Sequence, residues 1–255
     1  MLCFLTVLFA SKAIMAKGIR VRGNDPADPS GKPVGASWTP GLEAMLCFLT
    51  VLFASKALMA KVIRVRGYAA QKKSPVILYT DASHSPHLSG LGICISDPST
   101  GSKYYSAAVC PAWVLAQFVH QDHVVNQLEL LVMVTAYLSF PEILRGRQVL
   151  HHVDNAAAIA AAINGYSSKV DLAHMANMYN LVVALMDVDA WVEYVASHAN
   201  IADIPSKLGN EFVPRHEDWG MLEGMGFVEA PMSFPTQAEW ENLALFEDRL
   251  HVAPQ

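Results

Sequence analysis

The sequence predicts an α/β domain between residues 74 and 208, built from five strands and three helices. Two observations support this. Short segments rich in β-branched and aromatic residues, bounded by turn-forming residues, alternate with longer segments that have helical apolar spacing. Hydrophobic residues also make up 53% of the 255-residue chain, which is enough to build a sizeable core.

Three of the predicted strands come first. They are PVILYTD (75–81), GLGICISD (90–97) and KYYSAAV (103–109). The sequence DPSTG (97–101) supplies turn-forming residues between the second and third strands. The first strand is predicted to end at Asp81, where a turn acid is the simplest interpretation.

Helices and strands alternate through the rest of the domain. The remaining strands are QVLHHVD (148–154) and AWVEYV (190–195), and the helices are predicted over 124–140, 155–165 and 167–186. Gly165 is expected to close the Ala-rich second helix, because glycine readily adopts the left-handed conformation at a helix C-terminus. Ser167 or Ser168 is expected to cap the third helix.

The N-terminal region contains a near-identical duplication. Residues 1–23 return as residues 45–67, and the Pro/Gly-rich stretch 24–44 between them reads as a linker. Each copy begins with ten apolar residues and ends with the basic sequence IRVRG. Ten residues are too few to span a bilayer as a helix, so a short amphipathic or partly buried helix is predicted, with a cleaved signal as the alternative. Residues 1–67 are expected to pack little against the domain.

The C-terminal region, residues 209–255, is predicted to form loops or short helices that pack on the domain. The four cysteines show no C-x-x-C spacing, which indicates reduced thiols in an intracellular protein and gives no sign of a structural zinc site. The chain has a net charge of −5 and no run of Lys and Arg. This balance argues against strong independent binding to a polyanion.

Four acidic residues occupy comparable places in this layout. Asp81 and Asp154 end the first and fourth predicted strands, Glu129 interrupts the apolar helix, and Asp203 follows the fifth strand. Each has an ordinary interpretation by itself. Asp81 and Asp203 would be turn acids, Glu129 would lie on the exposed edge of an amphipathic helix, and Asp154 would cap the Ala-rich helix.

The four acids have a different interpretation if the fold brings their side chains together. Four neighbouring carboxylates repel one another, so their coexistence requires divalent cations. Oxygen ligands without Cys or His favour Mg²⁺ or Mn²⁺. Two such ions about 4 Å apart activate water and stabilise the leaving oxygen of a phosphodiester. The pattern therefore predicts nuclease chemistry.

Residues from about 75 to 208 resemble the ribonuclease H domain of reverse transcriptases, with the order Asp, Glu, Asp, Asp. The motifs that carry the resemblance are YTDAS, QLELL, HHVDNAAAIAAAINGYSS and VASHANIADIPSK. Three segments look like the same domain in retrotransposons of the DIRS and gypsy types: the last of these motifs, RGRQVLHHVDNAAA and PMSFPTQAEW (231–240). The resemblance implies a five-stranded mixed sheet flanked by helices. Its first three strands form an antiparallel meander, and the other two lie parallel to the first.

The resemblance also implies roles for the four acids. Asp81 would bridge two metal ions, Mg²⁺ or Mn²⁺. Glu129 and Asp154 would complete the ligands of one ion, and Asp203 would complete those of the other.

Further residues match positions at which this family contacts the substrate. Asn126 and Asn155 would contact the substrate backbone, and Ser83 of the YTDAS motif is another candidate for substrate binding. His198 lies only five residues before Asp203. It is either a proton shuttle or product-release group, or a solvated loop residue.

The predicted function is a metal-dependent endoribonuclease that cuts the RNA strand of RNA–DNA hybrids and leaves 3′-hydroxyl and 5′-phosphate ends. No segment before residue 75 resembles a polymerase, and Asp and Glu outnumber Lys and Arg between residues 74 and 208. Either a polymerase partner supplies the binding to the hybrid, or the chain is a fragment of a decayed element. The alternative is a catalytically silent structural or interaction module, and an integrase or exonuclease of the same superfold ranks lower. No membrane association is expected.

Overall fold

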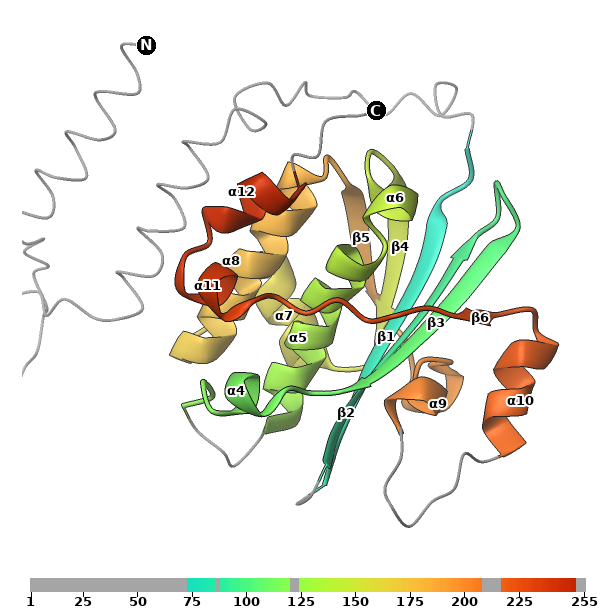
Figure 1. Cartoon of the computed structure of the whole chain (residues 1–255), viewed down its shortest axis with the longest axis horizontal. Coiled ribbons are helices and arrows are strands. Elements are labelled where there is room, and N and C mark those ends of the chain that lie inside the picture. The colour runs from blue at the N-terminus through green and yellow to red at the C-terminus, as the bar shows by residue number, and fades with distance from the viewer. Residues whose placement is uncertain (1–72, 86–87, 120–123, 208–216, 251–255) are drawn as a thin grey trace, which may run out of the picture.

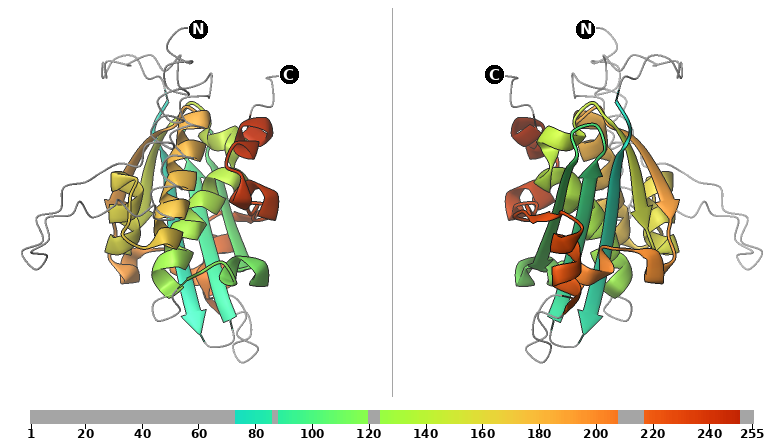
Figure 2. Two further views of the ribbon diagram at one scale, coloured as in Figure 1. Left: turned by 90° about the vertical axis from the view of Figure 1, so that its left-hand side faces the viewer. Right: turned by 90° about the vertical axis from the view of Figure 1, so that its right-hand side faces the viewer.

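The computed structural model describes residues 73–85, 88–119, 124–207 and 217–250, which form a mixed β-sheet with helices on both faces (Figures 1 and 2). The duplicated segment 1–67, its linker 24–44 and the expectation that they pack little against the domain lie outside the described residues.

Six strands make up the sheet, in the order β5-β4-β1-β2-β3-β6. They are β1 (Val76–Ser85), β2 (Leu88–Asp97), β3 (Ser102–Val109), β4 (Gln148–Val153), β5 (Asp189–Tyr194) and β6 (Val228–Glu229). Strands β1 to β3 form an antiparallel meander, and β4 and β5 extend the sheet parallel to β1. The predicted mixed sheet of ribonuclease H type is confirmed. The predicted number of five strands is wrong, because the two-residue strand β6 pairs parallel to the outer edge of β3.

Strand β1 is longer than the sequence predicted. Its parallel pairing with β4 ends at Thr80 and Val153, but its antiparallel pairing with β2 continues to Ser85 and Leu88. Asp81 therefore lies within β1 and not at its end. The sequence shows where the apolar run of the strand stops, whereas the hairpin with β2 fixes where its hydrogen bonding stops.

The helices of the described residues form two unequal layers. They are α4 (Ala112–Leu115), α5 (Val124–Ser139), α6 (Pro141–Leu144), α7 (Ala156–Asn164), α8 (Val170–Leu185), α9 (Asp203–Ser206), α10 (Glu217–Gly224), α11 (Gln237–Glu241) and α12 (Leu245–Leu250). Helices α5 and α8 pack on each other and cover one face of the sheet, while α9 and α10 lie over the other face (Figure 2). Because α5 lies between the sheet and α8, it is buried almost all round.

Local sequence determines the ends of α7, but not the start of α8. The Asn155 side chain accepts hydrogen bonds from the backbone N–H groups of Ala157 and Ala158, so Asn155 caps α7. Gly165 closes α7 with a φ of 63°, as predicted. The expected serine cap of α8 is wrong, since the N-cap residue is Lys169, whose side chain makes no capping bond.

The second face of the sheet has a small apolar cluster of its own. Cys94, Tyr105, Leu222 and Phe227 are buried there, and Ile204 of α9 packs against them. This cluster holds the short helix α9 beside β1 and β2.

The C-terminal residues cross the sheet edge and return to the helical layer (Figure 1). Trp240 and Phe246 belong to the main core, and the Trp240 ring meets the Trp113 ring edge-on at a centroid distance of 6.0 Å. The Arg249 guanidinium donates to Glu239 and to the hydroxyl of Ser233, which ties this return segment together. The residues after the last predicted strand therefore complete the core. None of the helices in the described ranges is long and apolar enough to cross a membrane.

Candidate active site

The parallel register of β1 and β4 places two acids next to each other. Thr80 of β1 pairs with Val153 of β4, and these are the last partners of the ladder. The next residue on each strand is an aspartate, Asp81 on β1 and Asp154 after β4. Asp81 is only 4% exposed, and Asp154 is half-buried. Two carboxylates thus lie side by side at the point where the strands part.

Glu129 approaches the same place from α5. Its side chain is 2% exposed, so the interpretation of an exposed helix edge is wrong. Its Oε1 atom accepts a hydrogen bond from the backbone N–H of Ala82, at 3.1 Å. The other oxygen, Oε2, is buried and has no hydrogen-bond partner among the described residues. A buried carboxylate oxygen without a donor is costly unless a cation meets it.

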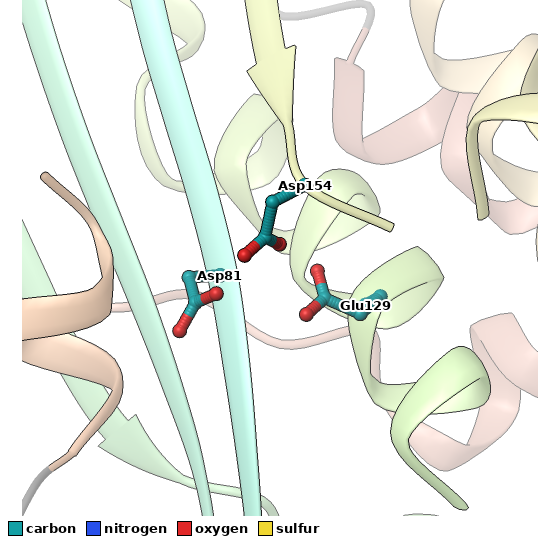
Figure 3. Close-up of side chains that lie close together, drawn as sticks. All are labelled: Asp81, Glu129 and Asp154. Atoms are coloured by element: carbon teal, nitrogen blue, oxygen red, sulfur yellow. The ribbon is translucent and has the colours of Figure 1, made fainter. Parts of the chain in front are cut away.

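Together these residues form a three-carboxylate cluster. One oxygen of Asp81, one of Glu129 and one of Asp154 all lie within 4.8 Å of one another, and the side chains point toward a common centre (Figure 3). The donors are carboxylate oxygens alone, a set that suits hard divalent cations such as Mg²⁺ or Mn²⁺. The ordinary interpretation of Asp154 as the α7 cap is wrong, because Asn155 fills that role.

Burial and mutual repulsion change the acidity of two of these groups. Burial, together with the charges of Asp81 and Asp154, raises the pKa of Glu129 to about 9. Burial also raises the pKa of Asp81 to about 7, although a hydrogen bond from Ser206 opposes the rise. A cation at this position would favour the charged carboxylates and relieve both effects.

Asp203 is placed differently from the other three acids. It begins α9, its side chain is 37% exposed, and its Oδ2 atom forms an ion pair with Nζ of Lys207 one turn later. Its oxygens are not part of the three-carboxylate cluster. It is nevertheless near enough for its charge to contribute to the raised pKa of Asp81. The structure therefore brings three of the four predicted acids together and leaves the fourth beside them.

The segment around α9 contributes residues that the sequence analysis missed. The Ser206 hydroxyl donates a hydrogen bond to Oδ2 of Asp81. The Asn200 amide donates to the carbonyl oxygen of Thr80 at 2.9 Å, directly before Asp81. On β2, a methyl group at Gly90 or Gly92 would overlap the backbone of the α9 segment. The pattern Gly-Leu-Gly within a predicted strand was the available signal, because strand glycines mark places of close backbone approach.

The predicted substrate-binding residues have different environments. The Asn155 amide donates to Oδ1 of Asn126 at 2.9 Å, so these two side chains form a pair beside Asp154. Ser83 donates its hydroxyl to the carbonyl oxygen of Ser206 at 2.6 Å. His198 lies on the one-turn 3-10 helix Ser197–Ala199 and is exposed to solvent.

Comparison with known proteins gives structural similarities only. No protein-family model matches the chain, and no curated protein matches it significantly. Ribonuclease H1 from the halophilic archaeon Halobacterium salinarum is similar at 13% identity, over 52% of this chain and 94% of that protein, with a TM-score of 0.40. The N-terminal ribonuclease H domain of a Mycobacterium tuberculosis protein is similar at 11% identity, over 54% and 91%, with a TM-score of 0.39.

A compost-derived ribonuclease H1 solved with an RNA/DNA hybrid is similar at 14% identity, over 51% of this chain and 92% of that one, with a TM-score of 0.35. The assignment of this chain to a ribonuclease H-like fold rests on the strand order and the placement of the helices described above.

Proposed function

We propose that this chain is a metal-dependent endonuclease that hydrolyses the RNA strand of RNA–DNA hybrids. The observation that carries the proposal is the three-carboxylate cluster with the buried, unsatisfied Oε2 atom of Glu129. A buried acid with a raised pKa beside two others is costly to maintain, so the cluster is better explained by a function than by stability.

The residues present fit a divalent cation. Asp81, Glu129 and Asp154 would hold the first ion, with Asp81 shared with a second ion near Asp203. When bound, such ions activate water for attack on a phosphodiester and stabilise the leaving oxygen. The hydrogen bond from Ala82 to Glu129 fixes one carboxylate oxygen, and the other is buried without a hydrogen-bond partner among the described residues.

Contacts to the hybrid are assigned to the polar side chains around the cluster. The Asn126–Asn155 pair would donate amide hydrogens to the substrate backbone, and Ser83 lies on the same strand as Asp81. His198 is exposed to solvent. It is either a proton shuttle or product-release group, or a solvated loop residue.

We further propose that the chain is part or a remnant of a retrotransposon reverse transcriptase of the DIRS or gypsy type, in which a polymerase domain holds the hybrid. Between residues 74 and 207 the basic residues are Lys103, Arg145, Arg147, Lys169 and Lys207. All of these except Lys169 bond to another residue of the protein. Lys103 and Arg145 donate to the carbonyl oxygens of Met225 and Leu250. Arg147 and Lys207 pair with the carboxylates of Asp97 and Asp203. Affinity for a duplex depends largely on the neutralisation of phosphates by basic side chains, so a partner has to supply most of these basic groups.

The direct test is cleavage of a hybrid by the full chain, with the RNA strand labelled at its 5′ end, in Mg²⁺ or Mn²⁺. We expect products with 3′-hydroxyl ends, and a loss of about 10³-fold or more in rate for Asp81→Asn, Glu129→Gln and Asp154→Asn. The matched controls are Asp248→Asn and Glu142→Gln, which change exposed acids on α12 and α6. These controls should cleave like the wild type.

A catalytically silent interaction module is the alternative function, and its predictions differ. It would give no cleavage by wild-type protein in either metal, and no shift of the thermal midpoint when millimolar Mg²⁺ or Mn²⁺ is added. Cleavage that persists in Asp81→Asn would point to a contaminating nuclease and contradict the proposed site.

A further inference from the structure

The segment Asn200–Ser206, here called the α9 segment, is fastened to the strands that carry Asp81. Asn200 is 3% exposed, and its amide holds the Thr80 carbonyl oxygen while its Oδ1 atom accepts from the N–H of Ala202 at 3.2 Å. At the other end of the segment, the carbonyl oxygen of Ser206 accepts from Ser83. The α9 segment is therefore bonded to β1 on both sides of Asp81.

Ser206 itself is fully buried, and its hydroxyl is directed at Asp81. Its exposed fraction is 0%, and its Oγ atom donates to Oδ2 of Asp81. The backbone N–H of Ser206 is bonded to the carbonyl oxygen of Ala202 at 3.0 Å, so the orientation of the residue is set by α9 itself. The Oδ2 atom of Asp81 is thus held by a side chain whose own position is fixed.

The close approach of the α9 segment is encoded in β2. A Cβ atom at Gly90 would overlap the Ser206 carbonyl oxygen, and a Cβ atom at Gly92 would overlap the Ala202 carbonyl oxygen. Gly92 is also the partner of Asp81 in the antiparallel ladder. Any larger residue at these positions would move Ser206 away from Asp81.

We infer that Ser206 is a positioning residue, which holds the Asp81 carboxylate in the orientation that binds the cation. Gly90 and Gly92 let the α9 segment approach β2 closely enough for Ser206 to reach Asp81. The inference rests on the proposed function, because it concerns the same metal site. Groups that hydrogen-bond a metal ligand fix its orientation, and losing one typically weakens metal binding by about 10–100-fold.

The test measures Mn²⁺ binding to the full chain by electron paramagnetic resonance, without nucleic acid, together with the Mn²⁺ concentration that gives half-maximal cleavage. Ser206→Ala should weaken Mn²⁺ binding about tenfold and raise the half-maximal concentration equally, while excess Mn²⁺ restores kcat. KM for the hybrid should stay unchanged, because Ser206 is buried behind Asp81. The control Ser102→Ala, which removes a hydroxyl near the exposed β2–β3 turn, should behave like the wild type.

Two further variants test the inference even if Ser206→Ala does not fold. Ser206→Cys keeps the shape of the side chain with a slightly larger atom and offers a weaker donor, so its Mn²⁺ affinity should lie between those of the wild type and the alanine variant. Gly92→Ala should weaken Mn²⁺ binding by displacing α9, whereas Gly220→Ala, where a methyl group meets nothing within 4 Å, should not. Urea unfolding in EDTA identifies the variants that are folded.

The outcomes separate this inference from the proposed function. If wild-type protein neither binds Mn²⁺ nor cleaves, the proposed function itself fails. If the wild type does both, and the folded Ser206 variants bind Mn²⁺ within about twofold of it, the positioning role is overturned and the cluster remains.

Discussion

Glu129 should make the metal-free protein less stable as the pH rises above neutrality. The ordinary pKa of its carboxyl is 4.5, and in the folded protein burial and the neighbouring acids raise it to about 9. Between these values the folded protein keeps a proton that the unfolded chain has lost. The unfolded state therefore binds fewer protons, and the free energy of unfolding falls as the pH increases. The Glu129 contribution is fully present below pH 4.5 and is lost progressively up to about pH 9.

The range from about pH 6.5 to 8.5 isolates this effect. Each pH unit in the range costs about 1.4 kcal/mol per proton, so two units correspond to about 3 kcal/mol. The buried His151, with its pKa lowered to about 3, changes stability only below its ordinary value of 6.5. The thiols Cys94 and Cys110, whose pKa values burial raises, affect stability only above their ordinary value of 9.0. Asp81, with a pKa of about 7, contributes only at the lower end.

Urea unfolding in EDTA, followed by tryptophan fluorescence at several pH values, measures the slope. Wild-type protein should lose about 3 kcal/mol across the range, and Glu129→Gln should lose much less, since the amide does not ionise and keeps the bond from Ala82. Glu142→Gln, an exposed acid on α6, should keep the wild-type slope. Saturating Mg²⁺ should restore stability at pH 8.5, because it binds the native cluster. A flat or rising wild-type curve in EDTA would show that the folded protein does not hold the Glu129 proton at neutral pH.

Three further predictions concern the frame of the fold. Phe246→Ala removes a fully buried ring of α12 and should cost about 3–5 kcal/mol in urea unfolding; a loss below about 1 kcal/mol would show that α12 does not complete the core. Arg147→Met leaves Asp97, which is 4% exposed, without its partner and should cost about 3 kcal/mol at pH 7. Because Arg147 holds the Asp97 pKa well below its ordinary value of 3.8, the wild-type advantage is fully present above that pH and should shrink as the pH falls below it; an advantage as large at pH 2 as at pH 5 contradicts this. Gly165→Ala, at a φ of 63°, should cost about 1 kcal/mol, measured against Gly220→Ala as control.

The sequence was most informative where one element determines its own structure. The apolar runs locate all five long strands, and Gly165 marks the end of α7 because only local backbone geometry is involved. The convergence of Asp81, Glu129 and Asp154 follows from the parallel ladder and the position of α5 across it. The resemblance supplied that ladder, since residue patterns alone do not give strand order.

The features that the sequence did not predict depend on tertiary contacts. Strand β6 has only two residues, too few for any periodicity, and forms because β3 offers an open edge. The importance of Ser206 depends on how closely α9 approaches β2; the Gly-Leu-Gly pattern signals a close approach to that strand but does not say which segment approaches it. Asp203 follows the fifth strand as predicted, but its ion pair with Lys207 depends on the one-turn helix between them.

The return of the C-terminal segment to α8 has a consequence for synthesis on the ribosome. Asp203, the last of the four acids, emerges well before Trp240, Phe246 and Leu250, yet these three side chains belong to the main core. A nascent chain that already contains every acid would still expose the apolar surface they cover. Because transiently exposed apolar surface favours aggregation, the domain should gain protease resistance during translation only after residue 250 has left the exit tunnel. The nascent chain therefore contains all four acids before it is long enough to complete its core.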